Sequence, residues 1–205
     1  MEPRWLRFLP EPPLQHAIEA EVLELKAGAE FAVRVPGLPR RIGRVLLAPA
    51  VLSLDSGRIE RGVWRACDLA ALALAECVST EAVQDLFEHG DRDERLMAVR
   101  VLPLISSAEA TRVLLQRLQS TNDQALFEAA FVDSDHAARL LDEGDWNRAS
   151  LKLAFIGVAV ERIMGTKERM NEALGQMLRD LAAERRAAGR EVWAGTDVLL
   201  SLLPR

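Results

Sequence analysis

The chain has 205 residues, a formal net charge of -5, and 49% hydrophobic residues. That length suits one domain with a sizeable core, and the composition is that of a globular protein rather than a disordered one. The acidic balance argues against nucleic acid as the main partner, because a phosphate-binding surface is normally basic. No stretch approaches the ~20 apolar residues of a membrane span, and the N-terminus lacks a secretory signal. We therefore expect a cytoplasmic protein without direct membrane insertion.

The two cysteines, Cys67 and Cys77, are expected to be free and buried. If both lie on one helix, ten residues separate them by roughly 15 Å along its axis. A disulfide requires Cα atoms about 5.5–6 Å apart. Free thiols are typical of a reducing cytoplasm.

The first 60 residues carry weak and irregular signals. Residues 1–13 are rich in proline and predict an irregular arm that apolar side chains can hold against the body: Trp5, Leu6, Phe8 and Leu9. The elements expected next are a helix over Leu14–Lys26, a short helix over Ala29–Val35, a loop from Pro36 to Arg44, and either two short helices or a buried connector over Val45–Leu54. Alternation and β-branched content are too low to predict strands anywhere.

From Gly62 onward the helical signals become regular. Three capping boxes, in which side chains satisfy unpaired first-turn N–H groups, are expected at Asp91–Glu94, Ser106–Glu109 and Thr121–Gln124. Thr80 and Thr196 are expected to cap single helices. The helices predicted are Val63–Val78, Glu81–Glu88, Arg92–Leu102, one after Ser106, one carrying Phe127 and Phe131, His136–Leu141, Lys167–Ala188 and Asp197–Leu203.

The segment Leu151–Val160 is apolar apart from Lys152 and Gly157. A helix that is apolar all round has no face for water, so we expect it at the centre of the fold. Short turns between the other helices indicate antiparallel hairpins. The pair that contains DRDERLMAVRVLPLI resembles a HEAT repeat, although the period is too irregular for a true solenoid. The predicted fold is therefore a single all-α domain over residues 1–205, with HEAT-like hairpins packed around a central buried helix.

Several segments, in this order and spacing, resemble the EboA domain family. They are PRRIG, LFEHGDRDERLMAVRVLPL, LFEA, WNRASLKLAFIGVAVERIMG and ERRAAGR, within residues 29–193. The resemblance implies a helical protein encoded beside a prenyltransferase-like membrane protein, a dehydroquinate-synthase-like protein and TIM-barrel relatives. That gene cluster is linked to making or exporting secondary metabolites. The partners that it implies are other proteins of this pathway, with the membrane prenyltransferase-like protein as one candidate.

The sequence offers no catalytic or metal-binding signature. The histidines His16, His89 and His136 are scattered, and neither cysteine has a ligand-spaced partner. Nucleophile-elbow and nucleotide-binding glycine motifs are absent. We therefore predict no metal, no cofactor and no catalytic residue.

Three groups of polar residues are candidate sites. Arg40, Arg41 and Arg44 could grip a phosphate or carboxylate, or could pair with neighbouring acids on a solvated loop. A second group at a helix junction could line a pocket mouth or hold a helix turn together: Asn147, Glu161, Arg162, Arg169 and Asn171.

The third group is a pair of lone charges in apolar helices, Glu128 and Lys152. Such charges are rarely buried without a partner. We expect Lys152 to be at least partly buried and to pair with Glu128. The functional alternative is an acid–base couple in a pocket.

Two functions remain open. The first is a non-enzymatic helical adaptor or carrier that docks partner enzymes or an apolar intermediate. The second is a small all-α enzyme acting on a prenylated or polyol-derived metabolite through carboxylate, Lys and Arg groups. A deep pocket with a polar floor around Glu128, Lys152 and Glu161 would favour the enzyme, whereas a packed core with an open groove would favour the adaptor.

Overall fold

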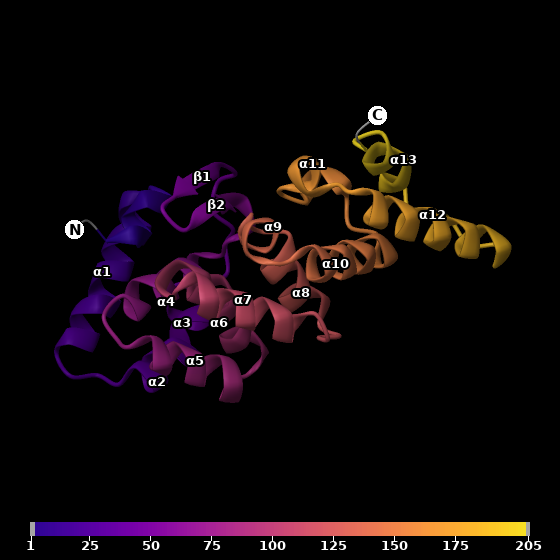
Figure 1. The fold of residues 1–205 in the computed structure, drawn as a ribbon. Helices are drawn as coiled ribbons and strands as arrows, with labels where there is room; N and C mark the ends of the chain where they lie inside the picture. The colour runs from indigo at the N-terminus through magenta and orange to yellow at the C-terminus, as the bar shows by residue number, and fades with distance from the viewer. Residues whose placement is uncertain (1–2, 204–205) are drawn as a thin grey trace.

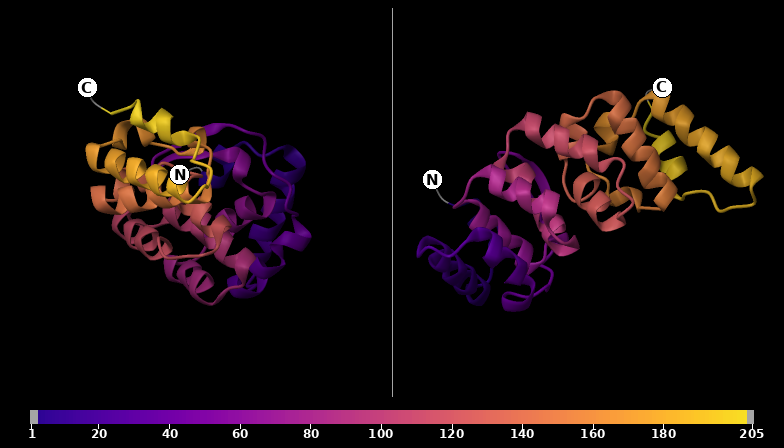
Figure 2. Two further views of the ribbon diagram at one scale, coloured as in Figure 1. Left: turned by 90° about the vertical axis from the view of Figure 1, so that its right-hand side faces the viewer. Right: turned by 90° about the horizontal axis from the view of Figure 1, so that it is seen from below.

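The computed structural model describes residues 3–203, and most of them are helical (Figure 1). The fold is elongated: the helices follow one another from α1 at one end to α12 and α13 at the other (Figures 1 and 2). The prediction of a helical fold is confirmed.

The elements in chain order are η1 (Arg4–Phe8), α1 (Pro12–Lys26), α2 (Phe31–Arg34), η2 (Val35–Gly37), α3 (Leu38–Arg41), β1 (Val51–Leu54), β2 (Gly57–Glu60), η3 (Arg61–Val63), α4 (Ala66–Ala75), α5 (Thr80–His89), α6 (Arg92–Ile105), α7 (Ala108–Leu118), α8 (Gln124–Phe131), α9 (His136–Leu140), α10 (Glu143–Ile156), η4 (Val160–Arg162), α11 (Thr166–Arg169), α12 (Glu172–Ala187) and α13 (Gly195–Leu200). The η segments are short 3-10 helices.

The most deeply buried helix is α4, in which every residue is buried. Its small alanine side chains let neighbouring helices approach closely, and it packs against η1, α1, α3 and α6. The prediction that Leu151–Val160 forms the central buried helix is wrong. Helix α10 ends at Ile156, with Gly157 in the left-handed region at a φ of 80°. Leu153 and Ala154 of that segment are buried, whereas the side chain of Phe155 is 59% exposed.

A two-stranded antiparallel hairpin corrects the expectation that the chain has no strands. Strands β1 and β2 pair from Val51 with Glu60 to Leu54 with Gly57. The loop after α8 continues this small sheet, because Glu60 N–H donates to the carbonyl of Asp133 at 2.9 Å and Asp135 N–H donates to that of Arg58 at 3.0 Å. The pairing thus brings a buried acidic loop, more than 70 residues away in sequence, against β2.

The predicted boundaries are correct where local side chains define them. The capping box of α6 is confirmed, since Asp91 and Glu94 each accept the other's backbone N–H. Other predicted caps are one or two residues off or absent: Ser79 replaces Thr80, Ser107 replaces Ser106, Asp123 replaces Thr121, and Thr196 does not cap α13.

Three predicted segments differ in structure. The expected N-terminal arm is ordered as a 3-10 helix from Arg4 to Phe8, with Trp5 and Phe8 buried, Leu6 half-buried and Leu9 exposed. Residues 1–2 of that arm lie outside the described part of the chain. The expected loop at 36–44 contains α3, and the expected long helix at 167–188 is divided into α11 and α12.

The cysteines are both free, as predicted, but Cys77 is exposed. Cys67 is buried in α4, and that burial is the main cause that raises the pKa of its thiol to about 11. A thiol with so high a pKa is protonated near neutral pH and therefore unreactive.

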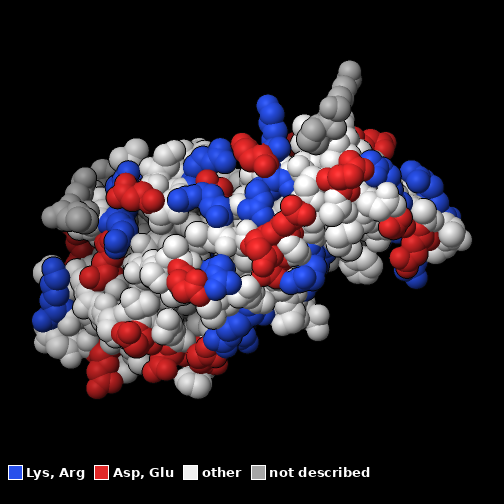
Figure 3. Space-filling view, in the orientation of Figure 1, with Lys and Arg blue, Asp and Glu red and all other residues white. Residues whose placement is uncertain are grey.

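Among residues 3–203, no helix combines the length and apolar character that crossing a bilayer requires. On the face drawn in Figure 3, acidic and basic side chains are interspersed. That face therefore carries no continuous surface of one charge.

Candidate functional site

The predicted ion pair between Lys152 and Glu128 is wrong. The ammonium of Lys152 instead donates to the backbone carbonyls of Gln119 and Thr121, at 2.9 and 2.6 Å, and lies 4.4 Å from the centre of the Phe127 ring. Lys152 is partly buried, as expected, and this desolvation lowers the pKa of its ammonium. Carbonyl groups at the end of α7 therefore stabilise the charge in place of a carboxylate.

Asn147 and Asn171 form a reciprocal amide pair. Each side-chain NH2 donates to the other's carbonyl oxygen, at 3.2 and 2.9 Å. Asn171 also caps α12 by accepting the N–H of Leu174. These two residues thus hold α10 against the start of α12.

Arg169 has a similar structural role. Its guanidinium donates to the backbone carbonyls of Ala138, Leu141 and Asp142. The same group lies 5.5 Å from the centre of the Trp146 ring. Arg169 therefore fixes α11 to the end of α9.

The arginine-rich segment splits into three different environments. Arg41 donates to both carboxylate oxygens of Glu21, and Arg44 donates to Asp93. Burial raises the pKa of Glu21, but hydrogen bonds from Arg41 and Arg34 outweigh it and hold that pKa below its usual value. Arg40 is exposed and has no side-chain partner within residues 3–203. The three guanidinium groups therefore do not converge on one anion.

A continuous network of alternating charges contains a member of each of the three predicted groups: Arg44, Arg162 and Glu128. Its central member is Asp68, a fully buried carboxylate on α4 that pairs with Arg65 at 2.7 Å and with Arg100 at 2.5 Å. The network runs in order through Arg44, Asp93, Arg65, Asp68, Arg100, Asp133, Arg162 and Glu128. Arg44 and Glu128, expected in separate sites, are therefore the two ends of one structure.

The middle of this network, from Asp93 to Asp133, contains none of the predicted site residues. Two signals were present: Asp68 is the main charge inside an alanine-rich helix, and Arg100 stands between Val99 and Val101 in an apolar stretch. Both residues occupy positions that are otherwise apolar. A charge at such a position requires a partner, because an unpaired buried charge is strongly destabilising.

A cleft of about 480 Å³ opens at the far end of the network, and its charged lining includes Arg100, Glu128, Asp133 and Arg162. Asp133 is buried beneath this cleft. Burial has the largest effect on the pKa of this carboxyl group and raises it. Arg100 and Arg162 act in the opposite direction and do not cancel the increase. Lys152 and Glu161 do not line the cleft, so the three residues named for a polar-floored pocket do not meet.

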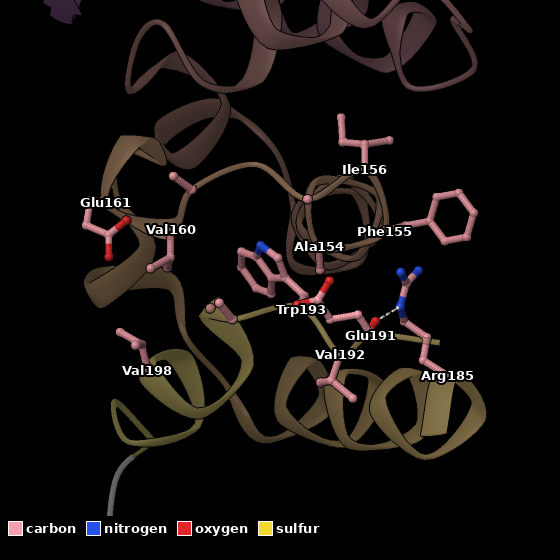
Figure 4. A pocket seen from close by; sticks show the side chains of 14 residues that line it. Ala154, Phe155, Ile156, Val160, Glu161, Arg185, Glu191, Val192, Trp193 and Val198 are labelled. Atoms are coloured by element: carbon pink, nitrogen blue, oxygen red, sulfur yellow. Dashed lines mark hydrogen bonds between the residues drawn. The ribbon is translucent and has the colours of Figure 1, made fainter. Parts of the chain in front are cut away.

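A second pocket, of about 490 Å³, lies between the end of α10, α12 and the segment that leads into α13 (Figure 4). Most of the residues that line it are apolar, Phe155, Val160 and Trp193 among them. The indole N–H of Trp193 donates to the carbonyl of Val158 at 2.8 Å, which fixes the ring in the wall. Glu161, one of the predicted residues, stands at one side of this pocket, and Arg185 stands at the other.

The segment between α10 and α11 therefore contributes to both cavities. Glu161 lines the apolar pocket, while its neighbour Arg162 lines the charged cleft. This placement follows from η4, a single 3-10 turn that directs successive side chains to different sides. Within residues 3–203, no group of three or more His, Cys, Asp or Glu residues is arranged to hold a metal ion.

Comparison with known proteins places the chain in a family. The family model described as metabolite traffic protein EboA matches residues 68–197, which run from within α4 to the start of α13 and include most of the apolar pocket. No curated protein and no solved structure matches the chain. The resemblance inferred from the sequence segments is confirmed over these residues, and the chain belongs to the EboA family of metabolite traffic proteins.

Proposed function

We propose that this protein is a non-enzymatic carrier that binds a small amphipathic metabolite in the apolar pocket between α10, α12 and α13. The observation that carries the proposal is that this pocket is built almost wholly from residues of the family-matched region. Its volume of about 490 Å³ lies in the range of small-molecule sites, ~300–1,000 Å³. A family named for metabolite traffic fits a protein that holds a ligand without transforming it.

The pocket lining supports an amphipathic ligand. Phe155 is 59% exposed and Val198 is 47% exposed, so two large apolar side chains beside the pocket remain uncovered. Burying such surface against an apolar ligand gains about 25 cal/mol per Å². Charged groups at two sides of the pocket give the ligand a defined orientation.

The test is to identify small molecules retained by the protein purified from its native host, by native mass spectrometry. Ala159 is exposed and lines the pocket, so Ala159→Trp should fill the cavity without disturbing the core. We expect this variant to lose the retained molecule. Ala183→Trp, at an exposed position of α12 that does not line the pocket, should keep it. Retention of the same molecule by both variants would rule out this pocket as the carrier site.

We further propose that the carrier works at the cytoplasmic side of the membrane and passes its ligand to other proteins of a secondary-metabolite pathway, the membrane prenyltransferase-like protein among them. The packing of α5 against α6, and of α6 against α8, supports a docking role, since stacked helical hairpins present extended surfaces. The test is sedimentation of the purified protein with the purified, detergent-solubilised membrane protein. Independent sedimentation at micromolar concentrations would contradict the docking role.

A second candidate function is a small helical enzyme, and one observation favours it. Asp133 has a raised pKa and lines a cleft beside Arg100 and Arg162, and such perturbed groups are common at catalytic sites. Turnover of a pathway intermediate by the purified protein would support this function, provided that Asp133→Asn abolishes the turnover and leaves the fold intact. Absence of turnover with the ligand found in the native preparation would favour the carrier.

A further inference from the structure

Arg185 lies in the last turn of α12 and lines the apolar pocket. Its Nε–H donates to the backbone carbonyl of Glu191 at 2.6 Å, the bond drawn in Figure 4. Across the described part of the chain, no carboxylate lies within 4.0 Å of its guanidinium nitrogens. A backbone carbonyl thus positions the guanidinium without neutralising its charge.

On the pocket side this guanidinium lies near the apolar side chain of Phe155 and beside Glu191, which also lines the pocket. In Figure 4 the guanidinium projects from α12 towards the wall that carries Phe155, while Glu161 stands on the opposite side of the pocket. Trp193 and Val160 lie between these two ends and are both buried. The pocket therefore has a basic residue at one end and an acidic residue at the other, with apolar side chains and Glu191 between them.

We propose that Arg185 binds the anionic head group of the carried metabolite, and that the apolar body of this ligand lies against Phe155 and Trp193. This inference rests on the proposed carrier function and specifies its ligand class: a molecule with a carboxylate, sulfonate or phosphate group at one end and an apolar, ring-containing or chain-like body. A guanidinium suits this role because its forked donors match the oxygens of such groups. With Nε held by Glu191, the two terminal nitrogens remain free to donate.

The negative end of the pocket restricts the orientation of the ligand. Glu161 is exposed and has no basic partner within 4.0 Å in the described residues. A second anionic group placed beside Glu161 would be repelled, whereas a hydroxyl or amino group could donate to it. The pocket thus favours ligands with a single anionic end.

The competing explanation is purely structural. A basic residue in the last turn of a helix interacts favourably with the partial negative charge of the helix C-terminus. Arg185 could serve that purpose alone, and its bond to Glu191 would then only fasten the following segment. Thermal stability does not separate the two roles, so the test must measure ligand binding.

The experiment uses two fluorescent probes that share the same rings. Anilinonaphthalene sulfonate is anionic, and phenylnaphthylamine is its uncharged counterpart without the sulfonate. We expect the wild type to bind the anionic probe more tightly. Arg185→Gln should weaken binding of the anionic probe by about tenfold or more, because a charge-assisted hydrogen bond is lost, and should leave binding of the uncharged probe unchanged.

The matched control is Arg186→Gln, which removes the same charge from the neighbouring exposed position that does not line the pocket. It should preserve the preference for the anionic probe. Equal weakening by both variants would mean a general electrostatic effect and would overturn the role of Arg185. Equal affinity of the wild type for the two probes would overturn it as well.

A third variant separates this inference from the carrier proposal. Ala159→Trp should abolish binding of both probes because it fills the cavity. If it abolishes both while the wild type shows no preference for the anionic probe, the pocket binds ligands but the proposed ligand class is wrong. If neither probe responds to Ala159→Trp, the carrier proposal itself fails.

Discussion

The guanidinium of Arg100 on α6 donates to the carboxylate of Asp68, which is completely buried on α4. These residues are 32 positions apart in sequence, and both side chains are at least nine-tenths buried. Their contact connects the two helices that form the centre of the fold. A charge pair, and not apolar packing alone, thus defines how α6 lies against α4.

We predict that Asp68→Ala strongly destabilises the protein. The substitution leaves two buried guanidinium groups, those of Arg65 and Arg100, without their shared partner. Breaking a buried pair in this way typically costs about 3–5 kcal/mol. Urea denaturation measures the loss. The control is Asp55→Ala, whose side chain is 99% exposed and whose pairing with Arg7 should contribute about 0–1 kcal/mol. Equal stability of the two variants would contradict a structural role for the network.

A second prediction concerns Lys152 and Glu128. Lys152→Met keeps the apolar stem but removes the donor to the carbonyls of Gln119 and Thr121. It should lower the free energy of unfolding by about 1–3 kcal/mol. Glu128 pairs with Arg162 instead. The effects of Lys152→Met and Glu128→Gln on the free energy of unfolding should therefore add, within about 0.5 kcal/mol in a double-mutant cycle. A larger coupling energy would show that the two charges interact after all.

Features encoded by neighbouring residues could be predicted from the sequence. The capping box of Asp91 and Glu94 is one, because its two hydrogen bonds connect residues three positions apart. The helical character of the chain is another. The hairpin at Val51–Glu60 was missed because each strand is only four residues long and much of its hydrogen bonding comes from the distant Asp133 loop.

Features that depend on distant contacts could not be predicted. The apolar character of Phe155 indicates that its side chain can be buried, but it does not show whether another element covers that side chain. In the folded chain Phe155 stays largely exposed. The need of Lys152 for a partner could be predicted, but not that carbonyls at a helix end would serve as well as a carboxylate. Glu161 could be assigned to a pocket, whereas Arg185 could not, because α12 meets α10 only in the folded chain.

A third prediction concerns the pH dependence of stability. Burial lowers the pKa of His136 from 6.5 to about 4. Between these values the unfolded chain binds a proton that the folded chain does not, so the free energy of unfolding falls as the pH falls through this window. The full effect is on the order of 3 kcal/mol. When the pH is lowered from 7 to about 4.5, the free energy of unfolding should therefore fall by about 2–3 kcal/mol less in His136→Gln than in the wild type. Urea denaturation at the two pH values measures the difference.

The control for this experiment is His16→Gln, because His16 is exposed on α1. This variant should keep the pH dependence of the wild type. Identical pH dependence in His136→Gln and the wild type would show that His136 does not remain neutral in the folded chain.

The last prediction compares two glycines with similar backbone angles and different surroundings. Gly157 ends α10 at a φ of 80°, and a Cβ placed there would meet no atom within 4 Å. Gly165 precedes α11 at a φ of 84°, and a Cβ there would lie 2.2 Å from the Cβ of Ala138 on α9. Gly157→Ala should therefore cost only the left-handed strain, about 1 kcal/mol. Gly165→Ala adds a steric clash and should cost about 2–4 kcal/mol.

Ala138→Gly provides the decisive comparison, because it removes the atom that the new side chain would strike. Ala138→Gly alone should destabilise α9 by up to about 1 kcal/mol. Combined with Gly165→Ala, however, it should restore the part of the protein's stability that the clash removes. The two substitutions should thus be non-additive in urea denaturation, with the double variant more stable than the sum of the single effects predicts. Additive effects, or equal losses for Gly157→Ala and Gly165→Ala, would show that α9 and α11 are not in close contact at this point. Such a result would also remove the basis for the contact between Arg169 and the end of α9, which depends on the same approach.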